Sequence, residues 1–184
     1  MPEISLHILD IAENSVRAGA TRIVIKVEAD TEADTLRVSI NDNGSGMSAE
    51  QLSQVTDPFF TTRTTRNVGL GVPFFKMAAE LAGGGLTIDS KEGEGTSLTA
   101  VFGLSHVDRM PLGDMTETIH TLVTMHEDID FLYLFRIDSD EFSLDTKDIR
   151  DALDGVSFNE SEVTEYIWRY LDVKETAVLR GRSI

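Results

Sequence analysis

The sequence predicts an α+β fold, because an amphipathic helix precedes a pair of strand-like segments and both kinds of segment recur further along the chain. In residues 3–18 the apolar side chains fall on one side of a helix, at about 100° per residue, and the polar ones on the other. Residues 22–29 and 36–41 alternate apolar and polar side chains like strands. Apolar residues make up 41% of the 184 residues, which is enough to fill a core.

The remaining segments form two groups that meet at residue 104. In the first group we expect a short helix that begins with a capping box of Ser48 and Gln51, a loop over 57–72, a helix over 73–82, and strands over 86–90 and 96–103. In the second we expect a linker over 105–114, a helix over 115–126, a hairpin around 138–140, and helices near 146–154 and 160–171. The chain is therefore expected to form one domain over 1–104 and a small α+β appendage over 115–184.

The charge distribution argues against several classes of function. The net charge is −16, of which residues 1–104 contribute −6 (8 basic minus 14 acidic) and residues 105–184 contribute −10 (8 minus 18). Such a surface disfavours nucleic acid and anionic membranes, because both are bound by clustered Lys and Arg. There is no cysteine and no apolar run of about 20 residues, and charges occur too early in MPEISLHILDIAEN for a signal peptide. We expect a cytoplasmic protein that binds neither nucleic acid nor membrane.

The first candidate site lies on the polar side of the helix 3–18. Asp10, Asn14 and Arg17 are spaced four and three residues apart, so they share one helical face. A carboxylate there could activate or orient a nucleophile, an amide oxygen could ligate Mg²⁺, and a guanidinium could hold phosphate oxygens. An ordinary amphipathic helix with a solvated polar face explains the same spacing, so the segment alone does not distinguish a binding site from such a helix.

The second candidate site is the segment VSINDNGSGM, where a strand runs directly into Asp42 and the spaced glycines Gly44 and Gly46. A carboxylate at the end of a strand can accept a hydrogen bond from an exocyclic amine such as N6 of adenine. Glycines allow the backbone to approach a ligand closely and to adopt positive φ. A plain turn is the alternative interpretation.

Two further glycine-rich segments follow. VGLGV, with Gly69 and Gly71, opens a helix, and the amides at a helix N-terminus can bind phosphate. GEGTS, with Gly95 and Thr96, lies between two strands and on its own reads as a hairpin turn. Each of these motifs is weak alone.

In this order and at these spacings, the segments resemble the GHKL ATPase superfamily, which includes gyrase, a heat-shock chaperone, histidine kinases and the mismatch-repair ATPase. The resemblance covers residues 3–104. Helix 3–18 resembles the N box, DNGSGM (42–47) the G1 box, DPFFTTR (57–63) the F box of histidine kinases, VGLGV (68–72) the G2 box, and GEGTS (93–97) the G3 box.

The resemblance implies a two-layer GHKL (Bergerat) α/β sandwich, with helices on one face of a mixed sheet and ATP with Mg²⁺ bound between the layers. It implies that Asn14 ligates the metal, that Asp42 reads the adenine, and that the loop 57–71 closes over the phosphates. The implied nucleotide-binding residues are Asn14, Arg17, Asp42, Gly44, Gly46, Met47, Arg63, Arg66, Gly69, Leu70, Gly71 and Thr96, with Asp10 as the catalytic residue.

Two positions depart from the family pattern. Gyrase-type enzymes place Glu four residues before the Asn of the N box, whereas this chain has Asp10, which is one methylene shorter. Kinases commonly have GTGLGL in the G2 box, whereas this chain has NVGLGV from Asn67 and lacks one glycine. The shorter acid predicts slow hydrolysis of ATP.

The motifs leave three functions open. Histidine kinases carry a helical phosphoacceptor region before the ATPase domain, and here the N box begins at residue 3, so we expect either that the acceptor is on a protein partner or that there is none. The first hypothesis is a kinase that phosphorylates a His or Ser of that partner in trans. The second is a conformational switch that binds ATP with little turnover, and the third is a gyrase-like ATPase that dimerises, so a homodimer stays open. SHVDRMPL (105–112) shares five residues with the phosphoacceptor motif SHELRTPL but is expected to be a linker.

Overall fold

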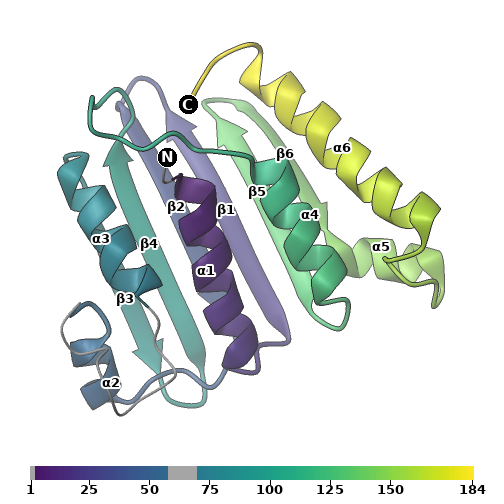
Figure 1. Cartoon of the computed structure of the whole chain (residues 1–184), viewed down its shortest axis with the longest axis horizontal. Coiled ribbons are helices and arrows are strands. Elements are labelled where there is room, and N and C mark those ends of the chain that lie inside the picture. Colours follow the sequence, from purple (N-terminus) through teal and green to yellow (C-terminus); the bar gives the residue numbers. More distant parts are fainter. Residues whose placement is uncertain (1–2, 58–69) are drawn as a thin grey trace.

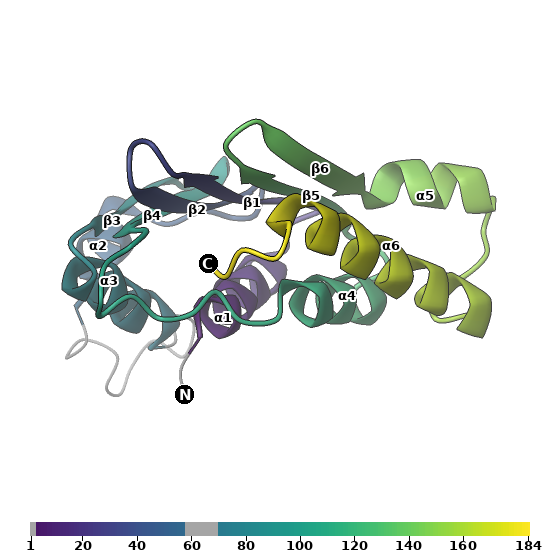
Figure 2. The same cartoon turned by 90° about the horizontal axis from the view of Figure 1, so that it is seen from above.

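The computed structural model describes residues 3–57 and 70–184, and it has two layers (Figures 1 and 2). One layer is a six-stranded mixed sheet with strand order β3-β4-β2-β1-β5-β6. The other is formed by helices α1, α3, α4 and α6, which lie together on one face of the sheet in Figure 2. The predicted α+β sandwich, with a mixed sheet and helices on one face, is confirmed.

The elements follow one another in the predicted order. The first group is α1 (Ile4–Arg17), β1 (Arg22–Asp30), β2 (Thr35–Asp42), α2 (Ala49–Gln54), α3 (Gly71–Leu81), β3 (Gly85–Lys91) and β4 (Gly95–Gly103). The second group is α4 (Met115–Met125), β5 (Asp130–Ile137), β6 (Asp140–Asp145), α5 (Thr146–Leu153) and α6 (Ser161–Leu179). Helix α6 continues eight residues past its expected end at 171, because Glu175 and Val178 keep its buried stripe going beyond Leu171.

The C-terminal group of elements continues the sheet of the first group. Strand β5 pairs in parallel with β1, which places Tyr133 beside Ile25, and β6 pairs in antiparallel fashion with β5. All the other neighbouring strands are antiparallel. The expected α+β part after residue 114 is therefore present and shares a sheet with residues 22–103. A domain boundary at 104 and 105 stays a prediction.

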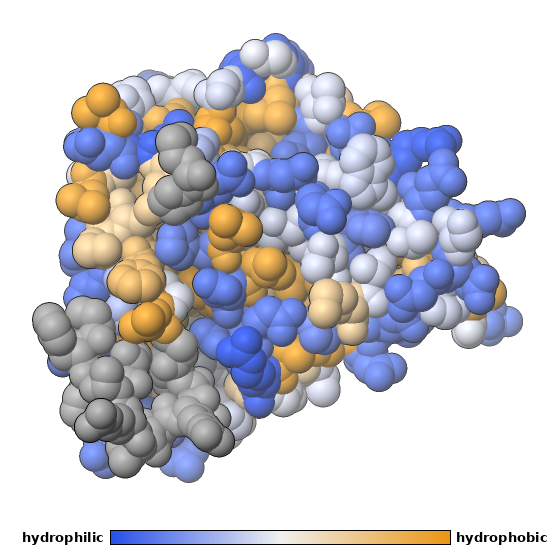
Figure 3. All heavy atoms as spheres, in the orientation of Figure 1, coloured by the Kyte–Doolittle hydropathy of each residue, from blue (hydrophilic) through white to orange (hydrophobic). Residues whose placement is uncertain are grey.

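The core lies between the sheet and its helices. Strand β1 alternates half-buried and fully buried residues along its length, as expected for a strand that turns one face to the core. On β5 the aromatic side chains of Phe131, Tyr133 and Phe135 are all buried, and α4 and α6 cover the part of the sheet formed by β5 and β6. Hydrophilic side chains predominate on the outer surface at this end, on the right of Figure 3.

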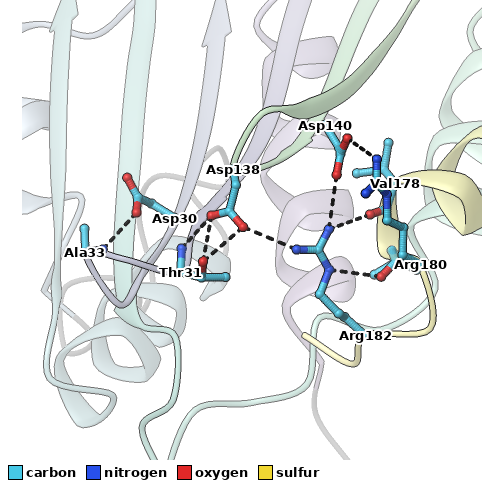
Figure 4. Close-up of polar contacts among 9 residues, drawn as sticks. Asp30, Thr31, Ala33, Asp138, Asp140, Val178, Arg180 and Arg182 are labelled. Carbon is cyan, nitrogen blue, oxygen red and sulfur yellow. Dashed lines mark hydrogen bonds and ion pairs between the residues drawn. The ribbon is translucent and has the colours of Figure 1, made fainter.

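The C-terminal tail is tied to the two turns that lie at one end of the sheet (Figure 4). Arg180 donates to the Asp140 carboxylate at 2.6 Å, and Arg182 donates to Asp138 at 3.3 Å. Asp138 also accepts from the backbone N–H of Thr31 at 2.8 Å, which joins the β5–β6 turn to the β1–β2 turn. These contacts fix the end of the sheet opposite to Asp42.

Across residues 3–57 and 70–184, no helix has the length and apolar character needed to cross a membrane.

Candidate functional site

A cleft of about 170 Å³ opens between α1 and the ends of strands β2, β3 and β4. Six residues predicted to bind nucleotide line it, namely Asn14, Arg17, Asp42, Gly46, Met47 and Thr96. The cleft is thus formed by segments that are far apart in the sequence and that were predicted to bind the same nucleotide.

The floor of the cleft consists of two rows of side chains across neighbouring strands. Directly paired residues of antiparallel strands point to the same face of a sheet, so each row takes one residue from β2, one from β4 and one from β3. The rows are Ile40, Leu98 and Ile88, and then Asp42, Thr96 and Ser90, and all of these except Ser90 line the cleft. An apolar floor beside a polar edge suits a flat heteroaromatic ring, which needs apolar contact on its face and hydrogen bonds at its rim.

The carboxylate of Asp42 is held in one orientation by two donors. The hydroxyl of Ser15 on α1 donates to Oδ2 at 2.6 Å, and the backbone N–H of Gly44 donates to Oδ1 at 2.9 Å. Ser15 is only 4% exposed, so this bond joins α1 to the sheet at the base of the cleft. Ser15 was not predicted, although a hydroxyl on the buried stripe of α1 requires a hydrogen-bond partner.

Gly44 and Gly46 are needed for the close passage of the loop after β2. A Cβ on Gly46, which has φ +64°, would lie 2.0 Å from the carbonyl oxygen of Lys91. A Cβ on Gly44 would lie 2.9 Å from the carbonyl oxygen of Ala18 at the end of α1. No side chain fits at either position, so the expectation that glycine is required there agrees with the geometry.

On α1 the predicted metal ligand and the predicted phosphate ligand are in contact. The guanidinium of Arg17 donates to Oδ1 of Asn14 at 2.8 Å, in line with their spacing of three residues. The oxygen expected to bind Mg²⁺ and the cation expected to bind phosphate therefore meet at the wall of the cleft.

Asp10 lies one turn earlier on α1, beside the start of α3. A Cβ on Gly71 would be 3.2 Å from Cβ of Asp10 and 3.7 Å from its Oδ2. Leu70 is the N-cap residue of this helix, and the first amides of a helix lack partners within it. The structure brings Asp10 beside Gly71, the residue that follows Leu70, whereas Arg63, Arg66 and Gly69 lie outside the described residues.

At the other end of the cleft, the hydroxyl of Ser90 joins two predicted residues. It accepts from the backbone N–H of Met47 at 2.9 Å and lies 2.9 Å from the hydroxyl of Thr96. Ser90 was not predicted, because a serine in a strand carries no sequence signal of the groups it will meet.

In the part of the chain that the structure describes, no three His, Asp or Glu side chains gather in a way that could hold a metal ion. A Mg²⁺ ion that accompanies a nucleotide does not need such a cluster, because it keeps several waters and takes phosphate oxygens with one or two protein ligands. The single amide oxygen of Asn14 fits that role.

The segment 105–112 lies at the opposite end of the sheet from the cleft. Its first residue, Ser105, donates from both its backbone N–H and its hydroxyl to Asp34, each at 2.9 Å. Asp34 immediately precedes β2, whose eight residues rise about 3.3 Å each, so about 26 Å of strand separates it from Asp42. This distance agrees with the expectation that the segment is a linker rather than a phosphoacceptor for the cleft.

Comparison with known proteins gives consistent matches. A family model described as "Histidine kinase-, DNA gyrase B-, and HSP90-like ATPase" matches residues 3–106. The Sensor protein kinase FleS of Pseudomonas aeruginosa is 36% identical over 110 residues, which are 60% of this chain and 27% of that protein. The Sensor histidine kinase ZraS of Escherichia coli K12 is 32% identical over 92 residues, which are 50% of this chain and 20% of that protein.

The matches to these two kinases cover only about a quarter of their length, or less. A solved structure described as "Crystal Structure of N terminal domain of a DNA repair protein" has a TM-score of 0.50 and 12% identity, over 79% of this chain and 52% of that chain. At that identity the likeness shows the fold alone.

Proposed function

The chain belongs to the family of histidine kinase-, DNA gyrase B- and HSP90-like ATPases, and from that membership we propose that its cleft binds ATP together with Mg²⁺. The observation that carries this proposal is the fixed carboxylate of Asp42 at the rim of an apolar floor. Ser15 and Gly44 both donate to it, so the carboxylate presents acceptors to the cleft. An exocyclic amine such as N6 of adenine is the matching donor.

The phosphates would lie along α1 toward the start of α3. Bound Mg²⁺ supplies positive charge that neutralises phosphate oxygens and orients them. Asn14 would hold the metal through Oδ1, the atom that accepts from Arg17 in the structure. The guanidinium of Arg17 would then pair with phosphate oxygens.

We propose further that the chain is a protein kinase that acts on a His or Ser of a partner. The bond between the γ-phosphorus and the bridging oxygen of ATP breaks, the partner's nitrogen or oxygen bonds to that phosphorus and gives up its proton to solvent, and ADP leaves. The names of the two relatives, both sensor kinases, support transfer over simple hydrolysis. In this proposal Asp10, which lies beside the start of α3, orients the acceptor.

A specific observation favours a switch with little turnover as the second candidate. Asp10 is not among the residues that line the cleft, and its short side chain lies against Gly71. Such a site would hold ATP and change the partner surface, with slow chemistry, because phosphoryl transfer depends on a well-positioned acceptor.

The C-terminal part is the proposed docking surface for the partner. Residues 105–184 carry −10 of the net charge, which steers basic proteins toward them. On α6 the side chains of Tyr166 and Val173, which are seven residues apart and share one face, are 60% and 57% exposed and offer apolar contact area.

The experiment incubates the purified chain with γ-labelled ATP, alone and with lysate of the native cell. The kinase proposal predicts no label on the pure chain and label on a lysate protein, which Asp10→Ala and Asn14→Ala should abolish. Bound ATP without label in either sample would favour the switch, and rapid phosphate release without label would favour a gyrase-like ATPase.

A further inference from the structure

The hydroxyl of Ser90 lies at a junction of three segments around the cleft. It accepts from the N–H of Met47 at 2.9 Å, donates to the carbonyl of Gly95 at 3.0 Å, and is 2.9 Å from the hydroxyl of Thr96. Met47 ends the loop after β2, and Gly95 begins β4. One side chain on β3 thus connects both glycine-rich segments that border the cleft.

The number of protons available fixes the direction of these bonds. A serine hydroxyl has one hydrogen to donate and two lone pairs that accept. Met47 N–H can only donate, and the Gly95 carbonyl can only accept. When Ser90 gives its hydrogen to Gly95, its second lone pair is left for Thr96, so all three contacts are satisfied only if Thr96 donates to Ser90.

This direction decides what Thr96 presents to a ligand. Its hydrogen is used by Ser90, so the hydroxyl oxygen turns lone pairs toward the cleft that it lines. Asp42, directly paired with Thr96 on β2, receives hydrogens from Ser15 and Gly44 and also presents acceptors. Two neighbouring acceptors at the rim of the cleft can accept hydrogen bonds from an amine, whereas they repel a carbonyl oxygen.

We propose that Ser90 is a positioning residue for base selectivity: by accepting the hydrogen of Thr96, it keeps that hydroxyl an acceptor toward the cleft, so that an aminopurine is preferred over an oxopurine. This inference rests on the proposed binding of ATP. Without the Ser90 hydroxyl, Thr96 can rotate and donate its hydrogen to a purine carbonyl.

The test is isothermal titration of ATP and of inosine triphosphate, which carries a carbonyl where adenine has its amine. In the Ser90→Ala variant the affinity for ATP should fall about tenfold, the loss expected for a disrupted hydrogen-bond network, while the affinity for inosine triphosphate should change far less. The ratio of the two affinities is the readout, because simple loosening of the fold would weaken both nucleotides equally.

The matched control is Ser97→Ala. Ser97 is also a strand serine near the same turn, but its hydroxyl donates to Asn41 on the solvent face of the sheet. In Ser97→Ala the ratio of the affinities for ATP and inosine triphosphate should equal that of the wild type. Ser90→Thr, which keeps a hydroxyl, should have a ratio close to that of the wild type. If Ser90→Ala does not fold, Thr96→Val removes the same acceptor and should lower the ratio similarly.

An unchanged ratio in Ser90→Ala or in Thr96→Val would overturn this inference while leaving ATP binding in place. An equal drop in both affinities would overturn it as well, since Ser90 would then only support the fold. If the wild-type chain binds neither nucleotide, the proposed function fails first and the inference fails with it, so the two failures are distinguishable.

Discussion

The stability of the protein should decrease as the pH rises from mildly acidic to mildly basic, because of one buried carboxyl group. Glu175 on α6 is 8% exposed and accepts from the Thr116 hydroxyl at 3.1 Å. The pKa of Glu175 is raised from 4.5 to about 7, mainly by burial and also by the nearby carboxylates of Asp114 and Asp172, against the lowering effect of the hydrogen bond from Thr116. The folded protein therefore holds this proton more tightly than the unfolded chain does.

The sign follows from proton binding. Because the folded pKa is the higher one, the stabilising effect of the proton is complete below the unfolded pKa of 4.5 and is lost as the pH rises through about 7. At about 1.4 kcal/mol per pKa unit, the shift corresponds to at most about 3.5 kcal/mol. The side chain borders a surface groove, so solvent reduces this to about 1–3 kcal/mol.

The assay is urea unfolding at about pH 5 and about pH 8 for the wild type and for Glu175→Gln, which imitates the protonated acid. We expect the two proteins to differ little at the lower pH and the variant to be more stable by about 1–3 kcal/mol at the higher pH. Glu165→Gln, on the exposed face of the same helix, is the control and should follow the wild type. A difference between Glu175→Gln and wild type that does not vary with pH would refute the reasoning.

Three further predictions follow from other contacts. The hydroxyl of Tyr133 is fully buried without a hydrogen-bond partner among the described residues, so Tyr133→Phe should leave the free energy of unfolding unchanged or raise it by up to about 1 kcal/mol in the same assay. Asn14→Ala and Arg17→Ala should weaken Mg·ATP more than adenosine in calorimetry, and equal losses for both ligands would make their role structural. Gly46→Ala should destabilise the fold by about 2 kcal/mol or more and reduce ATP binding, because its Cβ would collide with the Lys91 carbonyl; a thermal shift of less than about 2 °C would contradict this.

Local sequence patterns predicted the helices and strands of this fold well, but they did not predict which distant strands pair with one another. The period of α1 and the alternation of β1 and β2 are properties of neighbouring residues, and the structure has these elements within a residue or so of the expected ends. The parallel pairing of β5 with β1 joins segments about a hundred residues apart, and no periodicity encodes which strands become neighbours. The sequence therefore predicted the α+β elements after residue 114 but not that β5 and β6 extend the sheet of the first group.

In the cleft, too, the sequence motifs identified some of the residues and missed others. Asp42 and Gly46 were found because glycines and a carboxylate at a strand end are unusual together, and the geometry needs them. Ser15 and Ser90 were missed, since a serine serves equally well in a helix, in a strand or on a surface. Their role depends on partners supplied by distant segments, which only the fold brings into contact.

Calorimetric titration of ATP into the wild type and into Asp42→Asn tests the central claim most directly. The amide of Asn presents donors as well as an acceptor, so the variant loses a charge-assisted bond to the adenine amine. That loss is about 1.5–3 kcal/mol, or about 10- to 150-fold in affinity. Asp89→Asn, an exposed position on β3, should bind ATP as the wild type does. The same affinity for ATP in Asp42→Asn and in the wild type would contradict the account.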